Sequence, residues 1–208
     1  MRKSSSIILL INIISILIGM YFLRFTDQVI ANYAIDSAHH IPMSKGNLIL
    51  IGLVPFIVVF TMDIIATLEA DEVKPFIKYY DRLKFMLCFA FQLLFILIIM
   101  SQFYSFTEKY IIGTIFTIVV LYGGYTLPKI TLNQVVGFKN KWTLSSEQIW
   151  NKVHIRGRSL SYLIGAFVLV LTYTKNTVMV VAVLIVIAVS IIYLTYYSYS
   201  LYKKEPGL

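Results

Sequence analysis

Six long apolar stretches dominate this sequence and leave little room for anything else. They cover residues 7–23, 47–67, 85–102, 110–127, 159–173 and 177–202. A helix needs about 20 mostly apolar residues to cross the hydrocarbon core of a bilayer. None of the stretches shows the period-2 alternation of a membrane β-barrel strand, and a backbone inside lipid must satisfy its own hydrogen bonds. Each stretch therefore predicts a membrane-spanning helix.

The composition indicates the same class of protein. Of the 208 residues, 59% are hydrophobic and only 13% are charged, whereas typical soluble proteins have about 25% charged residues. Six spans of about 20 residues use roughly 120 positions, which leaves no room for a separate soluble catalytic domain. We predict an all-α, polytopic membrane protein that forms one integral membrane domain over residues 1–208.

The basic residues predict how the spans are oriented, because cytoplasmic loops of membrane proteins are enriched in Lys and Arg. Six spans put both termini on one side, and 14 of the 18 basic residues fall on that side. The other four are Arg24, Lys45, Lys109 and Lys175. We therefore expect both termini to be cytoplasmic. No small-residue cleavage pattern follows the first stretch, so it is expected to be a retained signal anchor.

The predicted cytoplasmic connector at residues 128–157 is unusually long, and long ordered connectors are often functional. Within it, Ser145 and Gln148 fit a capping box, which predicts a helix that starts at about Ser146. Several apolar or small residues then follow at helical spacing, namely Ile149, Trp150, Val153 and Gly157. This pattern predicts a short amphipathic helix that lies in the membrane interface before the fifth span.

The same connector carries an ordered set of residues with a known counterpart. Gly123-Gly124-Tyr125-Thr126-Leu127-Pro128-Lys129 is followed by Asn133 and Gly137, then by Trp142-Thr143-Leu144-Ser145-Ser146-Glu147-Gln148-Ile149-Trp150 and by Lys152-Val153-His154. This order resembles the signature of the SdpI family of bacterial immunity proteins. That signature runs approximately G-N-x-x-P-K, N-x-x-x-G-[IL]-R-T-P-W-T-L-S-x-E-x-[VI]-W and K-T-[HN]-R. An ordered match over about 35 residues is far more specific than one short motif.

The resemblance implies a six-span protein of the bacterial cytoplasmic membrane that protects the producing cell against a secreted peptide or protein toxin. It also implies a sensor role, in which toxin engagement lets the protein hold a cytosolic transcriptional repressor at the membrane. The implied partners are the toxin, the repressor and the lipid bilayer, without direct nucleic-acid binding. The residues expected to serve the toxin response or partner contact are Pro128, Asn133, Gly137, Lys139, Trp142, Thr143, Leu144, Trp150, His154 and Gly157.

Three departures from the signature separate this chain from the family pattern. Tyr125 replaces an Asn, Lys139-Asn140-Lys141 replaces Arg-Thr-Pro, and Val153-His154-Ile155 replaces Thr-His/Asn-Arg. Because Lys lacks the planar bidentate donor set of Arg, a ligand gripped by the family arginine would be held differently here. The two Trp residues, Trp142 and Trp150, fit either a partner surface or interfacial anchors.

Polar residues inside the predicted spans suggest an alternative function. Asp63 is the only acid within a span, and intramembrane acids often serve proton relays or ion sites. With Gln92 it defines a candidate intramembrane polar site, which would suit a small secondary transporter or ion-coupled carrier. Pairing of Asp63 with Lys74 or Arg82 is the structural alternative, and interhelical hydrogen bonding is the alternative for Gln92.

No enzyme motif was found, including metalloprotease, nucleophile-elbow and phosphate-loop patterns, so no enzymatic activity is expected. His154 has no Cys or acid at ligand spacing, so neither a metal nor a cofactor is expected. The segment at residues 69–84, with its mixed charges, is expected to be a solvated loop. Gly157, Ser161 and Gly165 form a small-residue stripe that predicts close helix packing.

Overall fold

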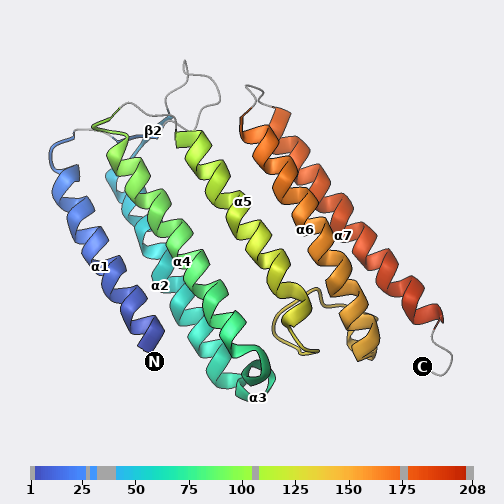
Figure 1. Cartoon of the computed structure of the whole chain (residues 1–208). Coiled ribbons are helices and arrows are strands. Elements are labelled where there is room, and N and C mark those ends of the chain that lie inside the picture. Colours follow the sequence, from blue (N-terminus) through green and yellow to red (C-terminus); the bar gives the residue numbers. More distant parts are fainter. Residues whose placement is uncertain (1–2, 27–28, 32–40, 105–107, 174–177, 205–208) are drawn as a thin grey trace. The chain divides into compact units, whose positions relative to one another are not determined.

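The computed structural model describes residues 3–26, 29–31, 41–104, 108–173 and 178–204, and these are mostly helical (Figure 1). The long helices are α1 (Lys3–Leu23), α2 (Lys45–Leu68), α4 (Ile77–Met100), α5 (Glu108–Thr126), α6 (Glu147–Thr172) and α7 (Val178–Lys204). Six helices in the described part of the chain are long and apolar enough to cross a membrane. The predicted all-helical, six-span class is confirmed. The predicted boundary between the last two spans, at residues 174–177, lies outside the described residues.

Short elements connect the long helices. α3 (Ala70–Val73) is followed by a 3₁₀ helix at Lys74–Phe76, and two further 3₁₀ helices cover Leu127–Lys129 and Thr143–Ser145. Strands β1 (Val29–Ala31) and β2 (Ile41–Met43) pair antiparallel, with Ile30 opposite Pro42. The sequence did not predict these strands, because three residues are too few to show an alternating pattern.

Contacts divide the chain into two compact units. Unit 1 contains Met1–Thr67 and Asp81–Phe116, and unit 2 contains Leu68–Tyr80 and Thr117–Leu208. The signature residues of the connector therefore belong to unit 2, whereas Asp63 and Gln92 belong to unit 1.

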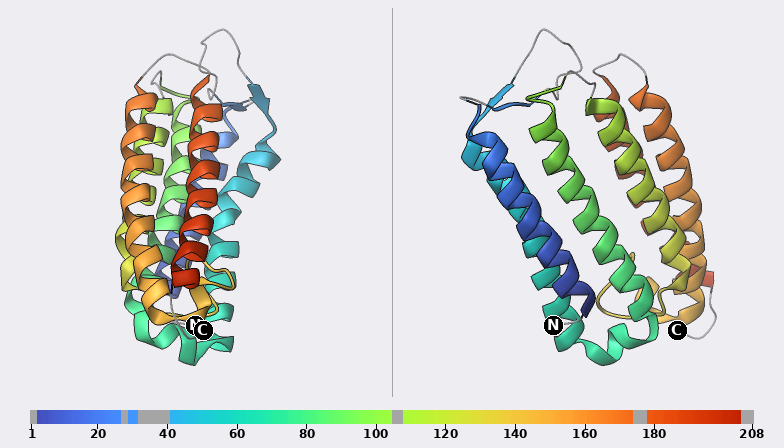
Figure 2. Two further views of the ribbon diagram at one scale, coloured as in Figure 1. Left: turned by 90° about the vertical axis from the view of Figure 1, so that its right-hand side faces the viewer. Right: turned by 60° about the vertical axis from the view of Figure 1, so that its left-hand side comes forward.

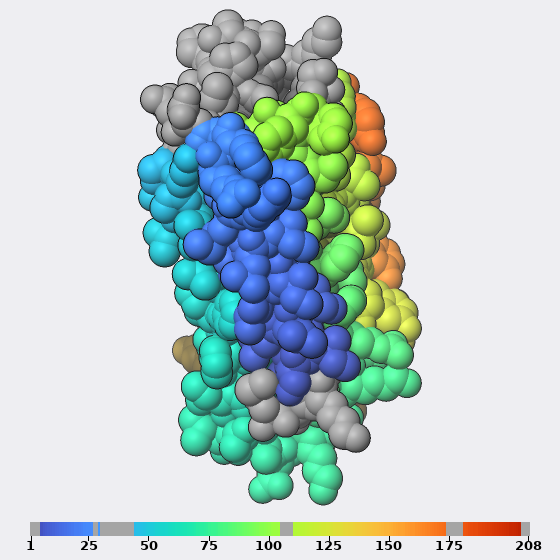
Figure 3. Space-filling view, turned by 90° about the vertical axis from the view of Figure 1, so that its left-hand side faces the viewer, coloured from blue at the N-terminus to red at the C-terminus, as the bar shows by residue number. Residues whose placement is uncertain are grey.

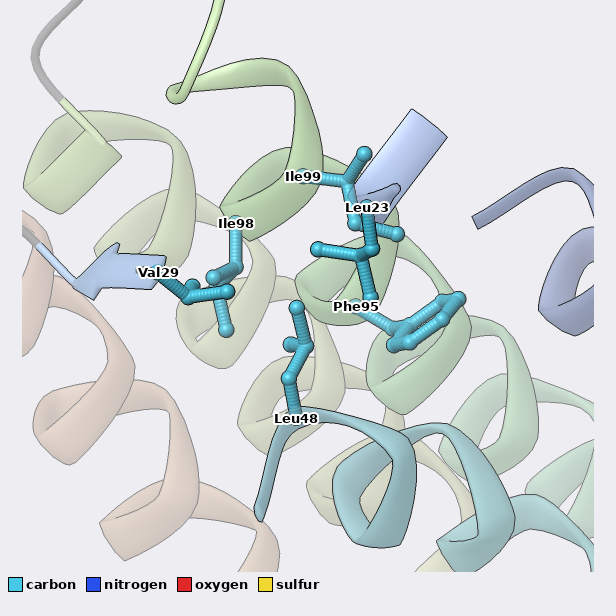
Figure 4. Packing of buried hydrophobic residues seen from close by; sticks show 6 residues of the cluster. All are labelled: Leu23, Val29, Leu48, Phe95, Ile98 and Ile99. Carbon is cyan, nitrogen blue, oxygen red and sulfur yellow. The ribbon is translucent and has the colours of Figure 1, made fainter. Parts of the chain in front are cut away.

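Unit 1 is built around the contacts of α1, α2 and α4. One buried cluster gathers side chains from these helices and from β1, as Figure 4 shows: Leu23, Val29, Leu48, Phe95, Ile98 and Ile99. A Cβ at Gly52 would lie 2.9 Å from Cε2 of Phe95, so the glycine gives this ring its space. The opposite side of α1 is uncovered and apolar, with Ile7 and Leu17 about 60% exposed (Figure 3). Such a face suits contact with lipid.

The expectation of a solvated loop at residues 69–84 is wrong. The segment forms α3, a 3₁₀ helix and the first turns of α4. The side chain of Lys84 is fully buried, because Asp63 and Asp81 compensate its charge at 2.7 and 3.3 Å. The expected pairing of Asp63 with Lys74 or Arg82 is therefore also wrong. Charge composition alone does not show which side chains will find partners inside a helix bundle.

The predicted separate amphipathic helix before the fifth span is wrong as well, because α6 is continuous from Glu147 to Thr172. The residue with the helix-capping role is Ser146, whose Oγ accepts a hydrogen bond from the Gln148 amide at 3.2 Å. Ser145 instead belongs to the preceding 3₁₀ helix. No proline interrupts α6, and Gly157 lies within the helix. A Cβ at Gly157 would lie 3.2 Å from the Leu127 side chain, so this glycine lets Leu127 pack closely against α6.

Helices α6 and α7 of unit 2 run side by side in opposite directions (Figure 2). Ile149 and Val153 of α6 pack against Leu194 of α7. On α5, a Cβ at Gly124 would lie 2.5 Å from Cβ of Ser161. A Cβ at Gly165 would lie 2.7 Å from the Leu121 side chain. The small residues of α6 thus let α5 approach closely, as the stripe predicted.

Candidate functional site

Trp150 holds the connector against α6. Its side chain is fully buried, and its Nε1–H donates a hydrogen bond to the carbonyl oxygen of Ile130 at 2.7 Å. Its ring stacks on the imidazole of His154, with centroids 4.0 Å apart. We call residues 130–154, which fold around this pair, the signature module. Because Trp150 lies in the interior of the module, it is not exposed as an interfacial anchor would be.

His154 and Gly137 form the second fixed point of the module. The Phe138 amide donates to His154 Nε2 at 3.1 Å, and His154 Nδ1 lies 2.8 Å from the Trp150 carbonyl oxygen. Since Nε2 accepts, Nδ1 carries the hydrogen and donates, which corresponds to a neutral imidazole. Gly137 has φ +127°, and a Cβ there would lie only 2.6 Å from Nε2. The geometry therefore requires glycine at this position.

Asn133 organises the first half of the connector. Its side chain is buried, and its Oδ1 accepts hydrogen bonds from the amides of Val135 and Val136, each at 2.7 Å. Its Nδ2 donates to the carbonyl oxygens of Thr131 and Val136. An Asn side chain that bonds backbone groups two and three residues away fixes a tight turn.

Asn140 does the same for the second half, although the sequence marked it only as part of a departure from the signature. Its Oδ1 accepts from the amides of Trp142 and Thr143 at 3.0 and 2.9 Å. Its Nδ2 donates to Ser198 Oγ on α7 at 2.9 Å. The buried Thr143 hydroxyl completes the turn by accepting from the Asn140 amide at 2.9 Å. The spacing of Asn and Thr is the signal that could have revealed this turn.

The exposed parts of the module carry cations and one indole. Lys139 Nζ donates to the carbonyl oxygens of Gln134 and Val135 at 2.8 and 3.1 Å. Lys141 lies over the Trp142 ring, 5.1 Å from its centroid. Trp142 is half-buried against Tyr199 of α7 and lines an open apolar hollow of about 530 Å³. Of the two Trp residues, Trp142 is the one that reaches the surface.

The remaining predicted residues support the edges of the module. Pro128 lies in the 3₁₀ helix Leu127–Lys129, where a missing amide donor costs little. Lys129 lies over the ring of Tyr125, 3.7 Å from its centroid, so the residue that departs from the family pattern has a local role. The Leu144 amide donates to the Asn140 carbonyl oxygen at 3.1 Å.

Asp63 forms a buried polar cluster in unit 1. Lys84 Nζ donates to Asp63 Oδ1 and to Ser5 Oγ, each at 2.7 Å, and Ser5 Oγ lies 3.0 Å from Asp63 Oδ1. The cluster joins α1, α2 and α4. Lys84 is a residue that sequence reasoning missed, because it stands at the edge of an apolar stretch among other charges.

Gln92 forms a separate polar contact. Asn12 Nδ2 hydrogen-bonds to Gln92 Oε1 and to the Gly52 carbonyl oxygen, again joining α1, α2 and α4. Gln92 is eight residues from Lys84 on the same helix, which corresponds to about 12 Å along its axis. The structure therefore places Asp63 and Gln92 in two layers of unit 1 and does not bring them together in one site.

The buried polar side chains of the signature module are engaged in internal hydrogen bonds, which suits a rigid surface for binding. Within the described ranges, no three His, Cys, Asp or Glu side chains are grouped to hold a metal ion.

Comparison with known proteins links the module to a family. Residues 129–197 match the model of the SdpI/YfhL protein family, and this range covers the whole module, the rest of α6 and much of α7. Immunity protein SdpI of Bacillus subtilis (strain 168) is 23% identical over 110 residues, which are 53% of this chain and 53% of that protein. The match thus spans about half the length of this curated relative. No solved structure matches the chain. These matches confirm the resemblance in the connector: residues 129–197 are similar to the SdpI/YfhL protein family, in a chain whose described part has six helices that are long and apolar enough to cross a membrane.

Proposed function

We propose that this chain is a membrane immunity protein that protects the producing cell against a secreted peptide or protein toxin. The observation that carries the proposal is the coincidence of the family match at residues 129–197 with the hydrogen-bonded signature module. The name of the Bacillus subtilis relative supports the same function. The module offers a rigid surface, and rigid surfaces bind partners at a smaller entropic cost.

The protection experiment compares a producing strain with a strain that lacks the gene, both challenged with the producer's own secreted fraction. We expect the deletion strain to die and the wild-type gene to restore survival. A Gly137→Val variant should fail to restore it, because its side chain would displace His154. Gly123→Ala is the matched control, since no atom lies within 4 Å of the added methyl group. Unchanged survival of the deletion strain would contradict the immunity function.

We further propose that the protein is a sensor that holds a cytosolic transcriptional repressor at the membrane. The support is the exposed cation of Lys141 beside Trp142, which reaches the surface next to an apolar hollow. Aromatic and cationic side chains beside an apolar hollow are typical of protein interfaces.

The sensor role is tested separately from protection. A Lys141→Gln/Trp142→Ala variant should keep toxin survival but lose the repressor from the membrane fraction and lose induction of the operon. Lys204→Gln/Tyr162→Ala changes similar side chains, neither of which lines this hollow, and serves as the control. If the first variant recruits the repressor normally, this surface is not the docking site.

The carrier hypothesis has weaker support, because the carboxylate of Asp63 is already engaged by Lys84 and Ser5. It predicts that Asp63→Asn abolishes substrate or ion uptake into reconstituted vesicles while the protein stays folded. If the same variant gives full toxin protection and the wild-type protein shows no uptake, Asp63 does not act in transport and the carrier hypothesis is contradicted.

A further inference from the structure

A small hollow with both polar and apolar lining lies between α6 and α7 at the end of the signature module. It has a volume of about 200 Å³ and is lined by Lys152, Ile155, Arg156, Ser159 and Tyr197. The Arg156 guanidinium lies over the Tyr197 ring, 5.5 Å from its centroid, which orients the guanidinium beside the hollow. The Ser159 hydroxyl contacts its own helix only through a long 3.4 Å hydrogen bond to the Ile155 carbonyl oxygen.

The two cations of the hollow form no ion pair with any residue that the structure describes. Lys152 and Arg156 are four residues apart on α6, where like charges repel. Among the residues that the structure describes, the ion pairs join Lys84 to Asp63 and Asp81, and none involves Lys152 or Arg156. An anion between the two side chains would remove their repulsion and would accept hydrogen bonds from both.

The length of α6 suggests that the hollow is close to the level of the lipid phosphates. α6 ends at Thr172, and a span of about 20 residues counted back from there begins near Val153. Lys152 and Arg156 are within one turn of that boundary. Tyr197 belongs to a group of tyrosines near the end of α7, and such groups mark the membrane interface. Ile155, which is 47% exposed, offers an apolar contact beside the cations.

We propose that this hollow binds the phosphate group of an anionic phospholipid. Arg156 would hold two phosphate oxygens in a bidentate contact, Lys152 would supply a second charge and the Ser159 hydroxyl a further donor. The exposed Ile155 would contact the apolar part of the lipid. The proposal does not depend on the immunity function, because it rests only on the charge and position of the hollow.

The test uses the full chain in nanodiscs of phosphatidylcholine with increasing amounts of phosphatidylglycerol. Native mass spectrometry measures how much phosphatidylglycerol stays bound to the released protein. Lys152→Gln/Arg156→Gln should lower the affinity about 30-fold, the loss expected for two basic residues near an anionic surface. Lys203→Gln/Lys204→Gln removes the same charge from the end of α7 and should retain most of the affinity. Arg156→Lys should give an intermediate value because it keeps the charge but loses the bidentate contact.

Three results would overturn the proposal. Equal losses in both double variants would show that only net charge matters. Displacement of the lipid by millimolar inorganic phosphate would assign the hollow to free phosphate ions. Unchanged lipid binding in Lys152→Gln/Arg156→Gln, together with loss of repressor recruitment, would assign the two cations to an acidic protein surface. Size-exclusion profiles and helical circular dichroism of each variant establish that it is folded.

Discussion

Gly137 is the residue on which the geometry of the signature module depends most directly. Its φ of +127° is rarely adopted by residues with a Cβ, and an added methyl group would collide with His154 and Trp150. We expect Gly137→Ala to lower the free energy of unfolding by about 2–4 kcal/mol, from backbone strain and overpacking together. Thermal unfolding of the detergent-solubilised protein, followed by tryptophan fluorescence, measures the change.

Gly46→Ala provides the comparison at a position with space. The nearest atom to the added methyl group is Ser44 Oγ at 3.8 Å, and alanine favours a helix over glycine. This variant should be as stable as the wild type or slightly more stable. Equal stability of Gly137→Ala and wild type would mean that the module tolerates a side chain at this position.

The roles of single residues were only partly predictable from the sequence. The resemblance pointed to Asn133, Gly137, Trp150 and His154, and the structure brings these four into one hydrogen-bonded arrangement. Their partners are mostly backbone groups, such as the Ile130 carbonyl and the Phe138 amide, and a sequence does not specify which backbone group faces a given side chain. The burial of Trp150 was missed for this reason.

At the scale of elements, the buried cluster around Lys84 joins three helices of unit 1. The Lys84 side chain is fully buried and that of Asp63 is 15% exposed, so removing one partner leaves the other charge poorly solvated. We expect Lys84→Met to lower the free energy of unfolding by about 3–5 kcal/mol. The double variant Lys84→Met/Asp63→Leu should recover most of this loss, because no unpaired charge at these two positions remains. Unfolding in a denaturing detergent measures both, and additive losses would show that the pair is not coupled.

Of the two adjacent glycines near the end of α5, only Gly124 lies close to α6. A Cβ at Gly124 would lie 2.5 Å from Cβ of Ser161, whereas one at Gly123 would meet nothing within 4 Å. We expect Gly124→Leu to separate the helices and lower the thermal midpoint strongly, while Gly123→Leu leaves it nearly unchanged. The two proteins have the same composition, so equal midpoints would show that this close approach contributes little to stability.

Helix type and number were well predicted, because long apolar runs in lipid have few alternatives to helices. The ends of the helices were less predictable. α4 begins at Ile77, well before the apolar stretch at residues 85–102, since Asp63 and Asp81 compensate Lys84. α6 continues through the predicted boundary between an interfacial helix and a span. In both cases tertiary contacts let a helix extend through polar residues that the hydropathy pattern assigned to a loop or an interface.

At the scale of the whole molecule, the family match and the polar clusters lie in different parts of the chain. The match at residues 129–197 falls within unit 2, whereas Asp63, Lys84, Asn12 and Gln92 lie in unit 1. The signature module is therefore in the part of the chain that matches the family model, and the proposed immunity function depends on that part. Unit 1 contains Asp63, and the Asp63→Asn variant is the one that distinguishes the carrier hypothesis from the immunity hypothesis.

The orientation of the whole chain in the membrane is the prediction on which the partner assignments depend. With 14 of 18 basic residues on one side, both termini and the signature module are expected in the cytoplasm. Alkaline phosphatase fused after Leu208 should be inactive, because it matures only outside the cytoplasm, whereas a fluorescent protein at the same position should be bright. Phosphatase fused after Tyr104, in the third-to-fourth connection, should be active. The reverse pattern would put Lys141, Trp142 and the hollow lined by Lys152 and Arg156 outside the cell. A cytosolic repressor could then not reach them.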